Sequence, residues 1–193
     1  MEHVLTIRRA LVAEYLPRRG VSTQNSEKLV DIILSSHEFL PRPEAENDSA
    51  YKQVIPYVVL TRGSEVFVTR RLKKGTETRL HGLLSIGIGG HVSREADGDG
   101  ADVLRRGMER ELAEEVFIEE AGALTPRGII NDDTQEVGSV HLGLLFTLEV
   151  SGEVRVRETE KLEGFWKSRA ELSALKAQME TWSQFAAEAL FSE

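Results

Sequence analysis

Three glutamates lie within one nine-residue stretch of the chain, RELAEEVFI at positions 110 to 118. They are Glu111, Glu114 and Glu115. Carboxylates forced together at a partly buried surface repel one another, and desolvation raises their pKa values, so a positive charge is expected to offset them. Magnesium takes oxygen ligands of this kind and usually keeps waters and substrate phosphate oxygens as further ligands. The stretch therefore indicates a divalent metal site suited to phosphate chemistry.

The residues before this stretch indicate a helix. Leu104, Met108 and Leu112 recur at every fourth position, as the buried stripe of a helix does. At roughly 100° per residue, Glu111 and Glu115 fall within or beside that stripe. Carboxylates four residues apart, with a third at the i+3 position, can all reach one centre from a single helix. We predict that this helix presents its glutamates on the inward side.

The alternative is a solvated row of glutamates, because charge runs usually face water. The other side of the helix already supplies a polar face, made of Arg105, Arg106, Glu109 and Ala113. Gly107 lies on the same side as Glu111, where a missing side chain would let the helix approach its neighbour closely. These positions favour the metal site over the solvated face.

The same stretch resembles the core of the Nudix box. That motif runs Gly, five residues, Glu, seven residues, then Arg-Glu-apolar-any-Glu-Glu-any-Gly-apolar. Six of the seven specified positions in its second part match: Arg110, Glu111, Leu112, Glu114, Glu115 and Ile118. The order of elements around the stretch is also similar to that family, and the resemblance covers roughly residues 51 to 190.

Three departures from the motif stand out. Phe117 replaces the glycine after the glutamates, and phenylalanine resists positive φ, so the helix is expected to leave by a different turn. Counting back from the arginine puts the upstream glutamate position on Asp102 and the opening glycine on Ala96. The natural glycines, Gly89 and Gly90, lie further upstream. A loop insertion of about six residues within SREADGDGA explains the offset, and such insertions cost little closure entropy.

The resemblance implies a hydrolase that cleaves a diphosphate linkage, usually in a nucleoside diphosphate joined to another group, with Mg2+ or Mn2+ as cofactor and water attacking phosphorus. Carried over by position, Glu111, Glu114 and Glu115 are the metal ligands, and Gly90 lends a backbone contact. Arg110 would orient a glutamate through a charge-assisted hydrogen bond. The chemistry agrees, because such hydrolysis needs a divalent cation to neutralise phosphate charge and to activate water.

The general base stays open among three glutamates. Glu115 belongs to the box itself, Glu136 lies in the NDDTQEVGS loop, and Glu163 precedes Gly164. The family draws this base either from the box or from varying loops. Glu136 and Glu163 could equally be ordinary surface glutamates.

Candidate phosphate contacts are fewer. The only dense basic stretch runs from Arg70 to Arg79, and either of these two arginines could face the cleft and bind phosphate. A solvated hairpin end is the simpler interpretation of the stretch. His91 follows two glycines near the expected site, so it is a candidate for contact with phosphate or metal. His141, in an expected strand, is interpreted as structural.

Two other functions compete with a hydrolase. A non-catalytic nucleotide or ligand sensor could keep the fold and lose the chemistry, although clustered carboxylates are costly to retain without a use. Diphosphate isomerase chemistry, as in isopentenyl diphosphate isomerase, would want a catalytic cysteine, and this chain has none. Substrate identity is not specified by any of these motifs.

The composition of the chain limits the classes of molecule that it is expected to bind. The chain has 193 residues, 40% of them hydrophobic and 29% charged, which is ordinary for one globular domain with an extension. Its net charge of −8 disfavours non-specific binding to nucleic acid or to anionic membranes. The longest apolar run, LGLLF, is far shorter than a membrane span, and the N-terminus lacks a signal-peptide core. We expect a cytoplasmic protein that binds a small-molecule diphosphate, and a homodimer is allowed.

The elements that must position these residues follow from periodicity. We expect an N-terminal extension at 1–50, packed on a Nudix-like hydrolase domain at 51–193. In the extension we expect a strand at 3–12, a helix at 26–40 and a connection at 41–48. In the domain we expect a hairpin of strands 53–60 and 65–71, an extended segment at 83–92, the glutamate helix at 102–116, and strands at 126–131, 139–150 and 153–157. One or two closing helices are expected at 168–191, with an interruption near Thr181. The predicted class is α/β, a Nudix-like α/β/α sandwich with a mixed β-sheet.

Overall fold

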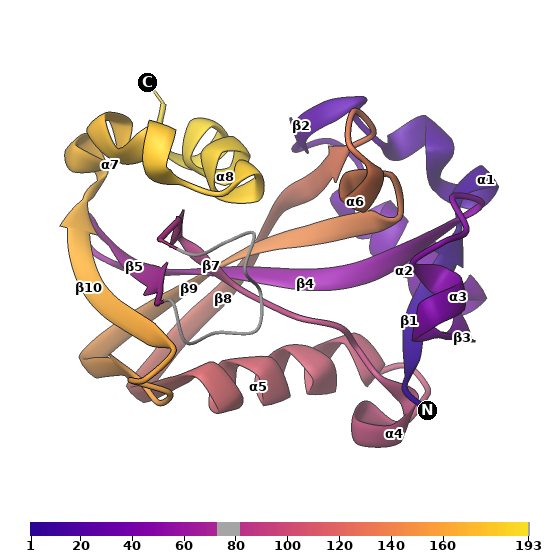
Figure 1. Cartoon of the computed structure of the whole chain (residues 1–193), viewed down its shortest axis with the longest axis horizontal. Coiled ribbons are helices and arrows are strands. Elements are labelled where there is room, and N and C mark those ends of the chain that lie inside the picture. The colour runs from indigo at the N-terminus through magenta and orange to yellow at the C-terminus, as the bar shows by residue number, and fades with distance from the viewer. Residues whose placement is uncertain (73–81, 193) are drawn as a thin grey trace. The chain divides into compact units, whose positions relative to one another are not determined.

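A computed structural model describes residues 1–72 and 82–192 of the chain (Figure 1). These residues form two compact units. The first unit comprises Met1–Tyr57, Gly89–Glu111 and Pro126–Phe146, and the second comprises Val58–Ile88, Leu112–Thr125 and Thr147–Glu193. Several elements contribute residues to both units. The assignment of residues 1–50 as an extension and 51–193 as a domain stays a prediction.

Six strands are hydrogen-bonded in the order β10-β5-β4-β9-β8-β2. Their bounds are β2 Arg19–Ser22, β4 Tyr51–Arg62, β5 Glu65–Arg71, β8 Val116–Asp132, β9 His141–Val156 and β10 Leu162–Ser168. β8 and β9 are longer than predicted, because the predicted strands at 139–150 and 153–157 form one continuous strand and β8 starts directly after the preceding helix. Helices lie between several of these strands along the chain, as expected of an α/β fold.

In the first unit, strand β1 (His3–Arg8) pairs with β3 (Glu38–Pro41) and with β4. Apolar side chains from these strands and from helix α2 (Ser26–Ser36) form a buried core. Its members include Leu5, Ile7, Leu29, Ile33 and Val54. Leu29 and Ile33 lie one turn apart on α2, so a single face of the helix packs inward.

Two predictions for residues 1–50 are wrong at their ends. The strand from residue 3 stops at Arg8, where helix α1 (Arg9–Val12) and a 3-10 turn (Ala13–Tyr15) begin. The helix from residue 26 ends at Ser36, and the segment after it pairs with β1 instead. His37 turns the backbone into the extended region while its N–H caps the Ile33 carbonyl. The expected connection at 41–48 contains a short helix, α3 (Arg42–Ala45).

In the second unit, β5 pairs with β10 along their full length, from Arg71 opposite Leu162 to Glu65 opposite Ser168. β4 and β5 form the predicted hairpin, in which Gly63 adopts the positive φ of 57° that the tight turn requires. The expected segment at 83–92 contains only two short strands, β6 (Leu84–Ser85) and β7 (Gly87–Ile88).

Two helices end the chain in the second unit, as predicted. α7 (Arg169–Leu175) starts at a capping box in which Ser168 and Glu171 exchange hydrogen bonds. A 3-10 turn (Lys176–Gln178) separates it from α8 (Thr181–Phe191), and the two helices lie beside each other (Figure 1). α7 and α8 account for the predicted interruption near Thr181.

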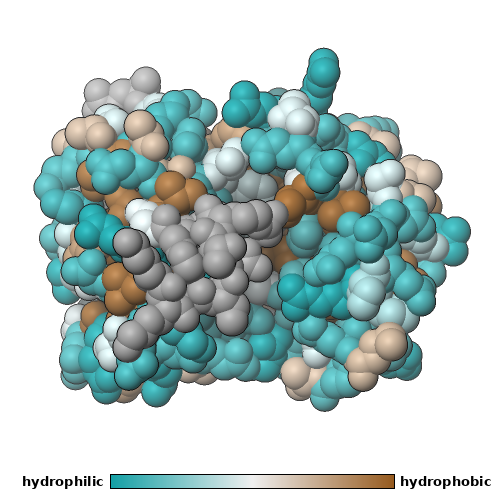
Figure 2. Space-filling model, in the orientation of Figure 1, coloured by the Kyte–Doolittle hydropathy of each residue, from teal (hydrophilic) through white to brown (hydrophobic). Residues whose placement is uncertain are grey.

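Hydrophilic residues predominate on the face drawn in Figure 2, where hydrophobic residues form only small separate areas. In the part of the chain that the structure describes, no helix combines the length and apolarity needed to cross a bilayer. This agrees with the absence of long apolar runs in the sequence.

Candidate metal and catalytic site

Helix α5 (Val103–Glu115) carries all three glutamates of the box, within one residue of the predicted bounds. The side chain of Glu111 is only 17% exposed and Glu115 is half-buried, whereas Glu114 is exposed. The predicted inward direction therefore fits two of the three. Met108 is buried as predicted. Leu104 and Leu112 are only half-buried, and the helix is anchored in addition by Val103 and Gly107.

Gly107 allows the close approach that the sequence suggested. A Cβ atom at this position would lie 2.7 Å from a methyl carbon of Val92. Val92 belongs to the buried core of the first unit, so the helix backbone packs directly against that core. The segment after Gly89 and Gly90, which contains Val92, therefore packs along α5.

Gly90 faces the carboxylate of Glu111. A Cβ atom on Gly90 would lie 2.4 to 2.6 Å from the carboxyl atoms of Glu111, which is closer than real contacts allow. A larger residue at this position would therefore force the Glu111 carboxylate to move. The structure brings together Gly90 and Glu111, two residues predicted for the metal site.

Arg110 organises this side of the helix. Its Nη1 donates to Glu111 Oε1 at 2.7 Å, and its Nη2 donates to the carbonyl of His91 at 2.8 Å. Its Nε and Nη2 also donate to the two carboxylate oxygens of Asp97, at 2.8 and 3.0 Å. A planar guanidinium with five donors suits such a fork. The hydrogen bond from Arg110 to a glutamate, required by the predicted role, is present.

Asp97 is the residue that sequence analysis missed. It is 4% exposed and also accepts a hydrogen bond from the Ser93 N–H at 2.8 Å. It ends the short helix α4 (Arg94–Asp97), which lies inside the proposed insertion and is capped by Ser93. Counting back along the motif led to Asp102, whose side chain is 62% exposed and only 3.6 Å from Arg105. The Ser93-Arg-Glu-Ala-Asp97 sequence, a helix cap before an acid, was the available signal.

Phe117 explains why the motif's glycine is not needed. β8 begins at Val116, immediately after α5, and Phe117 is a strand residue without positive φ. Its ring lies under the guanidinium of Arg155, 4.8 Å from the ring centre. The N–H of Arg157 donates to the carbonyl of Glu115, and its Nε donates to the carbonyl of Val116. The chain thus leaves the helix directly into a hydrogen-bonded strand.

The two loop candidates for the general base differ in their surroundings. Glu136 starts the short helix α6 (Glu136–Ser139) and is exposed. None of the residues in 1–72 and 82–192 forms an ion pair or hydrogen bond with its carboxylate. Glu163 lies on β10 and pairs with Arg70 at 3.4 Å. The Glu136 carboxylate is therefore available to a water, whereas that of Glu163 is already paired.

The structure describes only two of the three residues predicted to contact substrate. Arg70 lies on β5, with its guanidinium 5.5 Å from the Phe165 ring centre and paired with Glu163. Arg79 lies outside the described residues. His91 Nε2 lies 3.3 Å from His141 Nε2. Burial, together with the charge of Arg42 and the neighbouring His141, lowers the pKa of His91 to about 3, so its imidazole is neutral near pH 7.

The donor types on α5 suit magnesium, because all three glutamate side chains offer oxygen. Across residues 1–72 and 82–192, however, no three Asp, Glu or His side chains gather closely enough to hold an ion. The residues thus fit a metal by chemistry and helical spacing, and their side chains are not drawn together.

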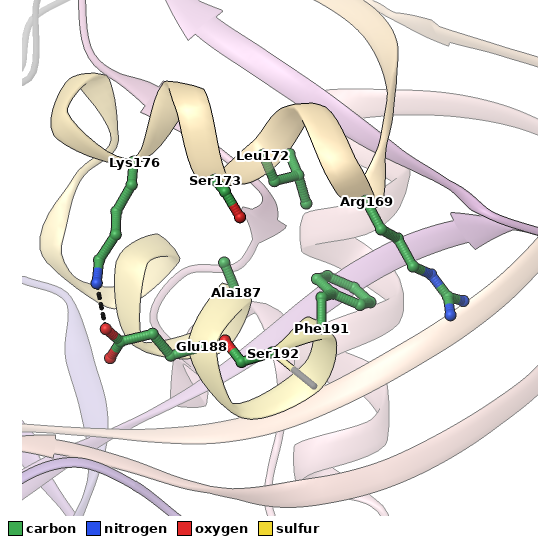
Figure 3. A pocket seen from close by; sticks show the side chains of 8 residues that line it. All are labelled: Arg169, Leu172, Ser173, Lys176, Ala187, Glu188, Phe191 and Ser192. Atoms are coloured by element: carbon green, nitrogen blue, oxygen red, sulfur yellow. Dashed lines mark hydrogen bonds and ion pairs between the residues drawn. The ribbon is translucent and has the colours of Figure 1, made fainter.

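The second unit also contains a cavity of about 160 Å³ between α7 and α8 (Figure 3). Lys176 and Glu188 pair at one side of it, and Arg169 lies 5.1 Å from the ring centre of Phe191. None of the predicted site residues is among those that line it.

The similarity of the chain to known proteins decides its family. No family model matches it. It is 39% identical to protein YmaB of Bacillus subtilis (strain 168) over 186 residues, which cover 92% of this chain and 90% of YmaB. The crystal structure of Tm1382, a candidate Nudix hydrolase, matches it with a TM-score of 0.85 and 34% identity over 98% of both chains. The chain belongs to the Nudix hydrolase family.

This membership confirms the resemblance drawn from Arg110 to Ile118 and the predicted Nudix-like α/β class with a mixed sheet. The protein is a Nudix-type hydrolase, and the activity common to that family is cleavage of a diphosphate linkage. The Nudix domain of Shewanella oneidensis NrtR, complexed with ADP-ribose, shares the fold at a TM-score of 0.55. With 14% identity over 72% of this chain and 85% of that domain, it shows the Nudix fold alone.

Proposed function

We propose that this Nudix hydrolase uses Mg2+ or Mn2+ to cleave the diphosphate linkage of a nucleoside diphosphate derivative, by attack of water at phosphorus. The observation that carries the proposal is the Glu111 carboxylate, which Arg110 fixes beside Gly90. Arg110 is fixed in turn by the buried Asp97. This chain of contacts orders a carboxylate where the box requires a metal ligand.

Glu111, Glu114 and Glu115 are the proposed protein ligands, because one helix carries them at i, i+3 and i+4. When bound, the metal neutralises phosphate charge and lowers the pKa of a water molecule. Within the chain, Arg110 holds the Glu111 carboxylate in position, and Gly90, which has no side chain, allows that carboxylate to lie against its backbone.

Among the candidate bases we favour Glu136. Its carboxylate is exposed, and no other described residue pairs with it. It can therefore accept a proton from the attacking water without first breaking an ion pair. Glu163 would have to leave Arg70, and Glu115 is already assigned to the metal. Glu115 and Glu163 remain the alternatives that substitution must test.

Arg70 is the proposed phosphate contact on β5, with a side chain that is 41% exposed. Arginine binds phosphate through paired N–H donors, and this would offset the repulsion between an anionic substrate and a chain of charge −8. His91 and Arg79 complete the proposed substrate contacts on the sequence argument. A cytoplasmic location and a homodimer likewise stay predictions.

Turnover of a panel of nucleoside diphosphate derivatives tests the proposal. The wild type with Mg2+ is expected to release product, and excess EDTA is expected to abolish release. Glu115→Gln should lower kcat by at least about a hundredfold, within the range for lost metal or acid–base chemistry. Glu109→Gln is the matched control, because Glu109 is an exposed glutamate of the same helix that pairs with Arg105. Equal turnover by wild type and Glu115→Gln, or no turnover by either, would contradict the proposed hydrolase activity.

Thermal unfolding gives a second readout that needs no substrate. Binding of Mg2+ to the folded state alone should raise the melting temperature of the wild type and of Glu109→Gln. It should raise that of Glu111→Gln and Glu115→Gln much less. Nucleotide binding without turnover would instead support the alternative of a non-catalytic sensor.

A further inference from the structure

The loop that carries Glu136 is hydrogen-bonded on its buried side to one lysine, Lys52. We call residues 131 to 141 the Glu136 loop. Lys52, on β4, is completely buried. Its Nζ donates to Asn131 Oδ1 at 2.8 Å, to Asp133 Oδ1 at 2.7 Å and to the Gly138 carbonyl at 2.9 Å. An ammonium has three donors, so all of its hydrogen-bonding capacity is spent on this loop.

Lys52 lies beside an opposite charge at the buried side of the loop. Burial lowers the pKa of Lys52, and the hydrogen bond and charge of Asp133 work against that shift. Burial would raise the pKa of Asp133, but the hydrogen bonds and charge from Lys52 and Asn131 outweigh it, and the pKa is lowered. Arg9 adds a second cation, which pairs with Asp133 and donates to the Ser139 carbonyl at 3.2 Å. A buried lysine is stable only with such partners.

Further contacts fasten the other end of the loop. His141 Nδ1 lies 2.7 Å from the Val137 carbonyl, which can only accept, so this nitrogen carries the proton. Gly138 packs so closely that a Cβ atom would lie 2.0 Å from the Asp132 carbonyl oxygen. The hydroxyl of Ser139 donates to the Glu136 carbonyl at 2.6 Å. Most polar groups on the inner side of the loop therefore have a partner, although the buried Oδ2 of Asp132 accepts no hydrogen bond from a described residue.

The outer side of the loop differs. Glu136 is exposed, and Val137 is 45% exposed although it is apolar. The loop thus has a fixed buried face and presents one carboxylate and one apolar side chain to solvent. A general base must be held within hydrogen-bond reach of its water, and a rigid support achieves this.

We infer that Lys52 is a positioning residue for this Nudix hydrolase, holding the Glu136 loop so that the Glu136 carboxylate meets the attacking water. Lys52 has no exposed surface, so it acts through the loop and not on the substrate. The inference rests on the proposed function, in which Glu136 is the base. It assigns a catalytic consequence to a buried ion pair that the Nudix box does not contain.

A double-mutant cycle on kcat tests the inference. Lys52→Met keeps an unbranched side chain of similar length and removes every donor. Alone, it should lower kcat by roughly tenfold or more with little change in KM, since general-base catalysis contributes about 10² to 10⁴-fold in rate. In the Glu136→Gln background it should have less than about a twofold further effect, because the base is already gone. Lys28→Met is the control, a lysine of the same unit that lies over the Tyr15 ring.

Hydrogen exchange gives a readout that does not need activity. In Lys52→Met the amides from Thr134 to His141 should exchange faster, while those of α2 keep their protection. Asp133→Asn serves as a second variant if Lys52→Met does not fold, and it should loosen the same amides.

The outcomes are separable. Additive effects of the two substitutions on kcat, or a Glu136→Gln variant with full activity, would overturn the positioning role. A loop that stays protected in both Lys52→Met and Asp133→Asn would overturn it as well. Wild-type protein that turns over no diphosphate would instead overturn the proposed function, and the exchange measurement would still decide whether Lys52 holds the loop.

Discussion

Arg110 and Asp97 form a two-pronged ion pair, with nitrogen-to-oxygen distances of 2.8 and 3.0 Å, thirteen residues apart in the chain. The Asp97 side chain is almost completely buried. The pair connects helix α4 to the arginine of the Nudix box. Glu111, the next residue, is oriented by the remaining nitrogen of the same guanidinium.

Removal of the Asp97 charge should damage both stability and activity. Asp97→Asn removes one of the two carboxylates that pair with the partly buried Arg110 guanidinium, so we expect a loss of about 1–3 kcal/mol in the free energy of unfolding. We expect turnover to fall by at least about tenfold, because Arg110 no longer holds Glu111 rigidly. Urea unfolding and steady-state kinetics measure the two effects. Asp102→Asn is the control, and a larger effect there than at Asp97 would restore the motif count.

The two glycines that contact the helix should fail in different ways. Gly90→Ala drives a methyl group into the Glu111 carboxylate, a flexible side chain that can move, so activity and Mg2+ binding should fall more than stability. Gly107→Ala pushes against the buried Val92, so overpacking should cost about 1–3 kcal/mol. Melting temperatures with and without Mg2+ separate the two. The same profile for both variants would contradict the placement of Gly90 beside a metal ligand.

Restoring the glycine of the motif should harm the protein. In Phe117→Gly the strand loses a half-buried ring that lies under Arg155, and glycine weakens a strand interior. We expect a loss of about 1–3 kcal/mol in the free energy of unfolding, without a gain in turnover. Chemical denaturation at pH 7 measures it. A variant more stable than the wild type would show that the chain strains at this turn.

Acid should weaken the Glu136 loop through Asp133. Its folded-state pKa is depressed below the ordinary value of 3.8, so the folded state binds fewer protons than the unfolded one. The stabilisation is fully present above pH 3.8 and is lost as the pH falls through the folded pKa. Asp133→Asn should therefore be less stable than the wild type at pH 7, and the difference should shrink below pH 3.8. Free energies of unfolding measured from pH 7 to pH 2.5 test this; a constant difference would contradict it.

The helix that carries the chemistry could be predicted because its signals are local. Leu104 and Met108 recur with helical spacing, and Arg110, Glu111, Glu114 and Glu115 have a spacing that repeats from one turn to the next. The predicted helix differs from the observed one by one residue at each end. The hairpin of β4 and β5 could also be predicted, because its turn residues lie between two segments rich in β-branched residues.

The partners of those residues could not be predicted, because they come from distant parts of the chain. Asp97 reaches Arg110 from the short helix α4, which lies in the segment where the insertion was predicted. Helix α2 ends before His37 although its apolar pattern continues, because the residues that follow pair with β1 as strand β3. The energy gained when two distant segments pair as strands cannot be inferred from the periodicity of either segment alone.

The sequence by itself determined the family, the α/β class and the identity of the clustered glutamates, because each depends on residue types at short fixed spacings. Only the tertiary structure decided that Asp97 fixes Arg110, that Gly90 faces Glu111 and that Lys52 lies beneath the Glu136 loop. These are contacts between residues up to 86 positions apart. Their formation depends on the burial and hydrogen bonding of whole strands, which no short stretch specifies.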